Sequence, residues 1–329
     1  MLTSQIGSAL AIQRGFYPAY PGMPSSQLVA QQLRPYPQFT TVGATLGPFI
    51  GKSWYDALQT KVTKRFSHGL QVQGSFVYSK ATDIGLGSEA GNISTLAGEA
   101  VIGDYFNYGT NKQLNQLTRP LATVISGSYT TPKFGADSRG MKVLSQAVRD
   151  WQLGFLLRYQ SGALVEAPAS QNQLNLQLQR TFPTLENYVP GVNPLAVDPN
   201  CHCFNPQTTQ VLNPNAWTDA PGGTWGVSAP FYNNYRWQRQ PAESMSFGRN
   251  FRMGREGRYN LAIRAEFQNI FNRLFLSAPL TNSNGGAVSA NAPITTVGGV
   301  NIGGYGSVAT IGGAGDTPRS GQMVARFTF

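Results

Sequence analysis

Charged residues are scarce in this chain. Asp, Glu, Lys and Arg make up 12% of its 329 residues, about half of the roughly 25% that soluble domains carry. The mean hydropathy is nevertheless negative, at -0.23, because Gly, Asn, Gln, Ser and Thr take the positions that charge usually fills. A membrane β-barrel predicts this combination, since its lipid-facing and lumen-facing residues cancel in the average.

Long apolar runs are missing as well. No run approaches the 18 or more apolar residues that a membrane helix needs, so a bilayer would leave only a closed barrel, in which every backbone N–H and C=O finds a partner. Residues 1–20 also lack a basic segment followed by an apolar core and a small-residue cleavage site, which leaves no recognisable signal peptide. For an exported protein this predicts that the chain is a fragment of something longer.

Residues that carry catalytic or metal chemistry are few. The chain has two cysteines and two histidines, and Cys201-His202-Cys203 is the one metal-like cluster. A single residue between the cysteines and the lack of a second pair make zinc a weak prediction, and a disulfide or free thiols are favoured. His68 lies in a predicted turn, so neither histidine is well placed for a catalytic Ser–His arrangement. We therefore expect no enzyme and no cofactor.

Positive charge exceeds negative charge. The formal net charge is +10, which could indicate nucleic acid or an anionic surface. The densest basic stretch runs from Arg236 to Arg258, and the favoured interpretation places its arginines at strand ends and in a turn. No nucleic-acid motif accompanies it, so we predict no nucleic-acid partner.

What the sequence does contain is alternation with period two. In residues 259–268, Tyr259, Leu261 and Ile263 alternate with polar residues that include Arg264 and Glu266, and a strand would place the two sets on opposite faces. The same pattern recurs at the C-terminus, where Phe327 and Phe329 form a terminal aromatic signature. Eight strands are predicted: 38–46, 53–66, 70–79, 119–131, 151–160, 243–252, 259–268 and 319–329.

The connectors between these strands differ in length. Short links are predicted at 67–69, 132–148 and 253–257, and long loops at 82–118, 162–242 and 271–318. In an outer-membrane barrel the short turns face the periplasm and the long loops face outward; the short link at 47–52 is an exception on the outer side. The prediction is therefore an all-β, antiparallel transmembrane barrel wall over 38–329, part of a larger barrel, preceded by a loop segment at 1–37.

Four charged residues occupy polar positions in the alternating pattern of the predicted strands. Arg158, Arg264, Glu266 and Arg326 are expected to face the lumen. In a complete barrel they would contact a plug or line the water path, and plain solvation of a polar interior remains the alternative.

Several segments resemble one family in that family's order. The chain resembles the TonB-dependent outer-membrane receptors, and among them the acidobacterial group with a carboxypeptidase-regulatory-like domain ahead of the plug. The resembling segments cover about 33–329: 33–39 (LRPYPQF), 54–59 (WYDALQ), 64–70 (KRFSHGL), 78–80 (YSK), 213–217 (NPNAW), 221–226 (PGGTWG), 264–272 (RAEFQNIFN) and the terminal Phe329.

The resemblance implies a 22-stranded barrel with an N-terminal plug that takes up a scarce ligand on energy relayed by TonB. This chain lacks a recognisable plug and TonB box, so the prediction is the C-terminal part of such a barrel in a Gram-negative outer membrane. Its expected partners are outer-membrane lipids, the rest of the barrel and plug, and, by resemblance, TonB; the ligand stays unknown. The alternative is a small eight-stranded barrel with a structural or adhesive role, since eight strands can close around a side-chain-filled interior.

Overall fold

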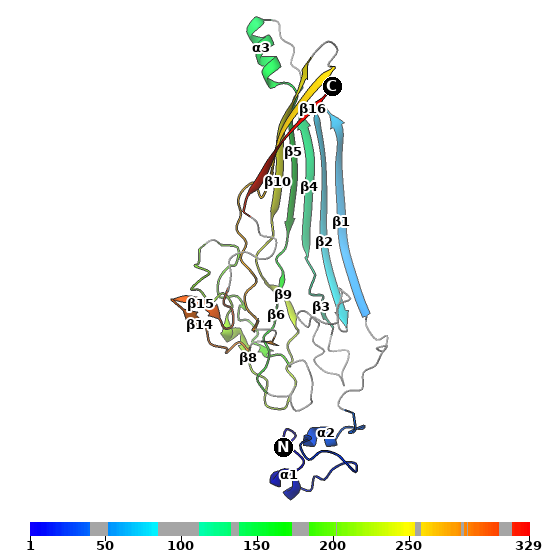
Figure 1. The fold of residues 1–329 in the computed structure, drawn as a ribbon, viewed down its shortest axis with the longest axis vertical. Coiled ribbons are helices and arrows are strands. Elements are labelled where there is room, and N and C mark those ends of the chain that lie inside the picture. Colours follow the sequence, from blue (N-terminus) through cyan, green and yellow to red (C-terminus); the bar gives the residue numbers. More distant parts are fainter. Residues whose placement is uncertain are drawn as a thin grey trace.

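The computed structural model describes residues 1–39, 52–84, 112–132, 138–172, 184–201, 203–253, 258–283, 286–287, 289–308 and 318–329. Seven long strands dominate it (Figure 1). These are β1 (Lys52–Ser67), β2 (Leu70–Ile84), β4 (Leu121–Thr130), β5 (Trp151–Gln160), β10 (Ala242–Met253), β11 (Tyr259–Gln268) and β16 (Ser320–Thr328).

Short elements make up the rest of the described secondary structure. The helices are α1 (Ala9–Gln13), α2 (Val29–Gln32), α3 (Arg139–Val148) and a 3-10 turn at Pro214–Ala216. The short strands are β3 (Gln113–Leu114), β6 (Leu164–Glu166), β7 (Asn187–Tyr188), β8 (Trp217–Thr218), β9 (Phe231–Arg236), β12 (Asn282–Ser283), β13 (Gly286–Ala287), β14 (Thr295–Val297) and β15 (Val300–Gly303). Among described residues, no helix is long and apolar enough to span a bilayer.

The long strands form one sheet in the order β1-β2-β4-β5-β10-β11-β16, and β3 adds to the end of β2. Each neighbouring pair is antiparallel, which confirms the predicted all-β antiparallel fold. Seven of the eight predicted strands are present with ends shifted by a few residues. The predicted strand at 38–46 falls, apart from its first two residues, outside the described part of the chain.

The register of the sheet separates two faces. Between β11 and β16, Ala262 lies opposite Arg326 and Glu266 opposite Gln322. The alternate positions pair apolar residues, such as Ile263 with Ala325. Because side chains opposite each other share a face, one phase of the sequence makes a polar surface and the other an apolar surface. We call them the polar face and the apolar face.

The two ends of the sheet differ (Figure 1). The turn between β1 and β2, α3, the last residues of β10, the first residues of β11 and the C-terminus lie at one end, which we call the turn end. The hairpin is tight because His68 and Gly69 both have positive φ, 52° and 81°, the conformation of a two-residue turn that suits twisted strands. A Cβ on Gly69 would sit 2.1 Å from the carbonyl oxygen of Thr130, so a side chain does not fit there.

The connector at 132–148 is more than a link. It holds α3, which begins after Ser138, whose Oγ accepts a hydrogen bond from the Met141 backbone N–H at 3.3 Å. An N-cap of this type satisfies one of the free N–H groups of the first turn. The predicted short link therefore contains a helix, which the length of the connector alone does not indicate.

The long connectors, taken as structureless loops, contain a folded core. Parts of 162–242 and 271–318 form two-stranded sheets, β6 with β9, β7 with β8 and β14 with β15, at the other end of the sheet. We call the described residues of these two connectors the cap. Their shared core contains Val165, Ala167, Leu185, Val211, Leu212, Ala216, Trp217, Tyr235, Trp237, Ala290, Tyr305 and Val308.

Polar contacts join the two connectors inside this core. The hydroxyl groups of Tyr235 and Tyr305 lie 2.9 Å apart and are buried. Glu186 Oε1 accepts hydrogen bonds from Ser289 Oγ at 2.6 Å and from the Ala290 backbone N–H at 2.9 Å. Because buried polar groups are costly unless paired, these contacts fix how the two connectors meet.

Residues 1–39, of which 1–37 are predicted as a loop segment, form a small unit of their own. Ile6, Ala11, Met23 and Val29 are buried together, and Ser8 caps α1 by accepting from the Ala11 N–H at 3.3 Å. The buried Gln31 donates to the carbonyl oxygens of Pro37 and Phe39, each at 2.7 Å.

The cap core generates a prediction on stability. Leu212 is fully buried, and Leu212→Ala should destabilise the cap by about 2–5 kcal/mol through lost contacts and a cavity. Limited proteolysis of the folded chain should then cut the cap at a lower protease concentration while the long strands stay protected. Val227→Ala, at a side chain 86% exposed, is the control and should leave the cutting pattern unchanged. Equal cutting of Leu212→Ala and the unaltered chain would contradict a cap core.

Candidate functional site

The polar face is the surface of the sheet on which polar side chains gather. Small and uncharged polar side chains predominate on it, with a few long charged ones. On the five strands from β2 to β11 it comprises Gln71, Gln73, Ser75, Val77, Ser79, Ala122, Val124, Ser126, Ser128, Thr130, Gln152, Gly154, Leu156, Arg158, Gln160, Ala242, Ser244, Ser246, Gly248, Asn250, Arg252, Asn260, Ala262, Arg264, Glu266 and Gln268. A surface of this kind suits contact with water or with another polar element.

The four charged residues predicted for the lumen all follow this phase. Arg264 and Glu266 form an ion pair at 2.5 Å, and Gln322 on β16 donates to the same carboxylate at 2.6 Å. Arg326 lies opposite Ala262, and Arg158 lies opposite Val124 on β4 and Ala242 on β10. The structure thus brings Arg264 and Glu266 together and leaves Arg158 and Arg326 apart from that pair in the register.

The centre of the polar face is lined by small residues. Ser128, Gly154 and Ser246 are direct neighbours across three strands. A Cβ on Gly154 would lie 2.6 Å from Ser246 Oγ, so the register itself favours a small residue there. Small residues leave space in front of the sheet.

The apolar face carries aromatic residues toward both ends. Near the turn end are Tyr129, Trp151, Phe251, Tyr259 and Phe327, and near the cap end are Trp54, Tyr78, Tyr159 and Phe267, with aliphatic residues such as Ile125, Leu157 and Ile263 between them. Such a band flanked by two aromatic girdles is typical of a barrel surface that faces lipid.

The terminal aromatic signature belongs to this face. The Phe327 ring stacks on Tyr259, and the Phe329 ring stacks on Phe327, each with centroids 6.1 Å apart. Phe329 is 89% exposed.

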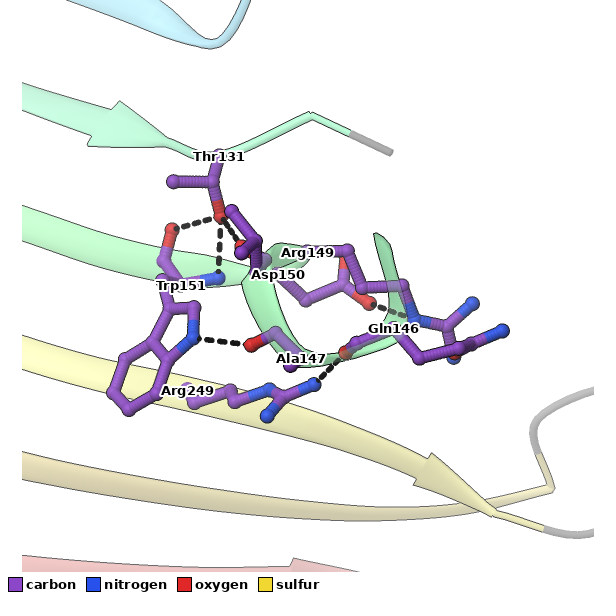
Figure 2. Close-up of polar contacts among 8 residues, drawn as sticks. Thr131, Gln146, Ala147, Arg149, Asp150, Trp151 and Arg249 are labelled. Atoms are coloured by element: carbon purple, nitrogen blue, oxygen red, sulfur yellow. Dashed lines mark hydrogen bonds and ion pairs between the residues drawn. The ribbon is translucent and has the colours of Figure 1, made fainter. Parts of the chain in front are cut away.

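At the turn end, α3 is fastened to the apolar face (Figure 2). The Trp151 indole N–H donates to the carbonyl oxygen of Ala147 at 2.8 Å, and Arg249 donates to that of Gln146. Thr131 Oγ1 donates to the Val148 carbonyl and accepts from the Trp151 backbone N–H at 2.9 Å. These contacts satisfy carbonyl groups that a helix end leaves free, and a cation there also suits the helix dipole.

A buried carboxylate lies where the apolar face meets the cap. Glu243 on β10 is 1% exposed, and both of its carboxylate oxygens accept from Arg273 Nε, at 3.1 and 3.0 Å. Arg273 also lies over the ring of Phe271, 5.6 Å from its centroid. The ion pair ties the segment after β11 to β10. Sequence reasoning missed it because the two residues lie far apart in the chain.

The weak metal candidate has a different arrangement. Cys201 and Cys203 form a disulfide, with their Cα atoms 5.2 Å apart, and His202 lies outside the described residues. Within the described residues no group of His, Cys, Asp and Glu is arranged to hold a metal ion. The cysteine pair therefore acts as a local staple in the cap.

One cap carboxyl has a strongly shifted pKa. Burial raises the pKa of Glu166, on β6, from 4.5 to about 7, because removal from water disfavours the charged form. The folded cap therefore binds this proton over a pH range in which the unfolded chain has released it.

This shift predicts a pH dependence. Between about pH 4.5 and 7 the folded state holds more protons than the unfolded state, so stability is full below pH 4.5 and falls as the pH rises. Glu166→Gln should remove that part of the pH dependence, which amounts to at most about 3 kcal/mol. Urea unfolding of the cap, followed by tryptophan fluorescence at pH 4 and pH 8, measures it. Equal pH dependence in the variant and the unaltered chain would contradict the assignment.

Comparison with known proteins agrees with the geometry of the two faces. A family described as an outer membrane beta barrel domain matches residues 5–308, which is most of the chain. No curated protein and no solved structure matches. The family resides in the outer membrane of Gram-negative bacteria, which accounts for an apolar face with aromatic girdles on an antiparallel sheet. The chain belongs to this family of outer-membrane β-barrel domains.

Proposed function

We propose that the chain forms the C-terminal part of the wall of a TonB-dependent receptor, which takes up a scarce ligand across the outer membrane. The small residues of the polar face carry this proposal, and the parity of the described strands supports a wall that extends beyond them. Six antiparallel pairings lead from β1 to β16, so β1 and β16 run in the same direction. An antiparallel wall cannot close by joining them directly and needs at least one further strand.

The small residues of the polar face support a wide barrel. An eight-stranded barrel fills its interior with its own side chains. Here Ser128, Gly154 and Ser246 adjoin one another at the centre of the wall, and side chains of this size leave room for a separate element such as a plug. The exposed Arg264 and the half-buried Glu266 on the same face would then meet that element or the water beside it.

The second candidate is the small eight-stranded barrel with a structural or adhesive role. It requires residues 38–46 to form the eighth strand between β1 and β16, which would satisfy the same parity. The folded cap at the outer end would then be the surface that meets a partner.

The wide barrel and the small barrel differ in whether the isolated chain closes into a barrel by itself. An open wall with two unpaired edges should unfold in SDS without heating, whereas a closed barrel resists detergent until boiled. We expect the isolated chain to migrate at the same position in gel electrophoresis with and without boiling. A compact, heat-modifiable band that Thr41→Pro abolishes would overturn the wide-barrel proposal, because proline there would break a closing eighth strand. Thr41→Ala, which keeps the backbone N–H at the same position, is the matched control and should leave any such band unchanged.

The two faces respond differently to charge. Ile125→Arg places a guanidinium on the apolar face near mid-strand and should destabilise the wall by about 2–4 kcal/mol in lipid. Ser126→Arg, on the neighbouring polar position, should cost little in a wide, water-accessible barrel. Urea unfolding in phospholipid vesicles compares the two variants. Equal losses would contradict the wide-barrel assignment, because a packed small interior would reject both arginines.

A further inference from the structure

Two arginines meet at the cap end of the wall, where β2 and β5 end and β4 begins. Arg119 precedes β4, and Arg236 ends β9. The pKa of Arg236 is lowered to about 10, first because burial removes its guanidinium from water and second because the charge of Arg119 is close. Burial lowers the pKa of Arg119 as well. Two like charges are thus held together in partly buried positions, which is unfavourable unless something compensates them.

Arg236 is held by neutral acceptors. Its Nη1 donates to the carbonyl oxygens of Thr118 at 2.8 Å and Gly162 at 3.1 Å. Its Nε and Nη2 donate to the carbonyl and side-chain oxygens of Asn233, each at 3.1 Å. These bonds fix the guanidinium where three segments meet, but they do not neutralise it. None of the ion pairs among the described residues involves Arg119 or Arg236.

Arg119 has an unused donor. Its Nη1 is buried and has no hydrogen-bond partner among the residues that the structure describes, and an unpaired buried donor on a charged group is costly. A guanidinium binds carboxylates and phosphates through paired N–H groups. Its free donor, beside the fixed charge of Arg236, therefore fits an oxyanion.

Unused acceptors lie near the end of β2 and on the segment that precedes Arg119. Asp83 Oδ1, Gln113 Oε1 and Gln116 Oε1 are buried and have no hydrogen-bond partner in the described part of the chain. Asp83 and Gln113 are direct neighbours across β2 and β3, and β3 packs against β9, which carries Arg236. Acceptors without donors suit the hydroxyl groups of a ligand.

We propose that this cluster, which we call the mouth site, binds an acidic sugar: its carboxylate or phosphate pairs with Arg119, and its hydroxyl groups donate to Asp83, Gln113 and Gln116. This deepens the proposed uptake function, on which it rests for its physiological meaning, by naming a ligand class. Arg236 acts as a positioning residue, since its hydrogen bonds are already committed and it contributes charge.

Direct binding tests the mouth site. Isothermal titration of the full chain, folded in detergent, would use glucuronate, glucose 6-phosphate and neutral glucose as probes. Both acids should bind at least about tenfold more tightly than glucose, and binding should weaken as salt is raised. Arg119→Gln should lose about tenfold or more for the acids with little change for glucose, and Arg119→Lys should recover part of the loss. Arg239→Gln, three residues beyond Arg236, is the matched control and should bind like the unaltered chain.

Several outcomes would overturn the mouth site. These are equal binding of glucose and the acids, no binding of either acid by the folded chain, or unchanged acid binding by Arg119→Gln. Gln113→Ala gives a second reading if Arg119→Gln folds poorly, and it should weaken the two acids and glucose together. Cap tryptophan fluorescence checks the fold of each variant. The electrophoresis result does not depend on this binding, so failure of the mouth site and failure of the wide-barrel proposal can be told apart.

Discussion

Backbone hydrogen bonding is the constraint on which this structure depends. In lipid no water is available to unpaired N–H and C=O groups, so each strand needs a neighbour on both sides. The register from β1 to β16 meets this need for every inner strand and, at the same time, sorts side chains into the polar and apolar faces. Within the described residues the outer edges of β1 and β16 have no partner strand, and their common direction sets the parity of whatever pairs them.

The two ends of the wall differ in how their strands are connected. At the turn end, connections are tight: a two-residue turn joins β1 to β2, and Trp151 and Arg249 hold the last carbonyl groups of α3. At the other end, long connectors fold on a core of their own, and Tyr235, Tyr305 and Glu186 join them by buried hydrogen bonds. The charged pair Arg119 and Arg236, which belongs to the proposed mouth site, lies where the wall meets the cap.

Period-two alternation made the wall predictable from sequence. Residues such as Arg264 and Glu266 could be assigned to one face because strand geometry allows two phases only. The cap could not be predicted in this way, because Trp217, Trp237 and Tyr305 come from irregular segments and meet through contacts distant in sequence. The same holds for Glu243 with Arg273 and for the mouth site. Helix α3 has a local signal in the sequence, a Ser cap before an amphipathic stretch. A prediction based only on the length of the connector does not use that signal.

The separation of the faces is the central claim, and site-by-site spin labelling of β11 in phospholipid vesicles tests it most directly. Labels at successive positions from 259 to 268, on a background with Cys201 and Cys203 replaced by serine, report collisions with oxygen and with a water-soluble nickel complex. The account predicts oxygen accessibility at odd positions and nickel accessibility at even positions, in strict alternation. Uniform accessibility along the strand, or the opposite phase, would contradict it.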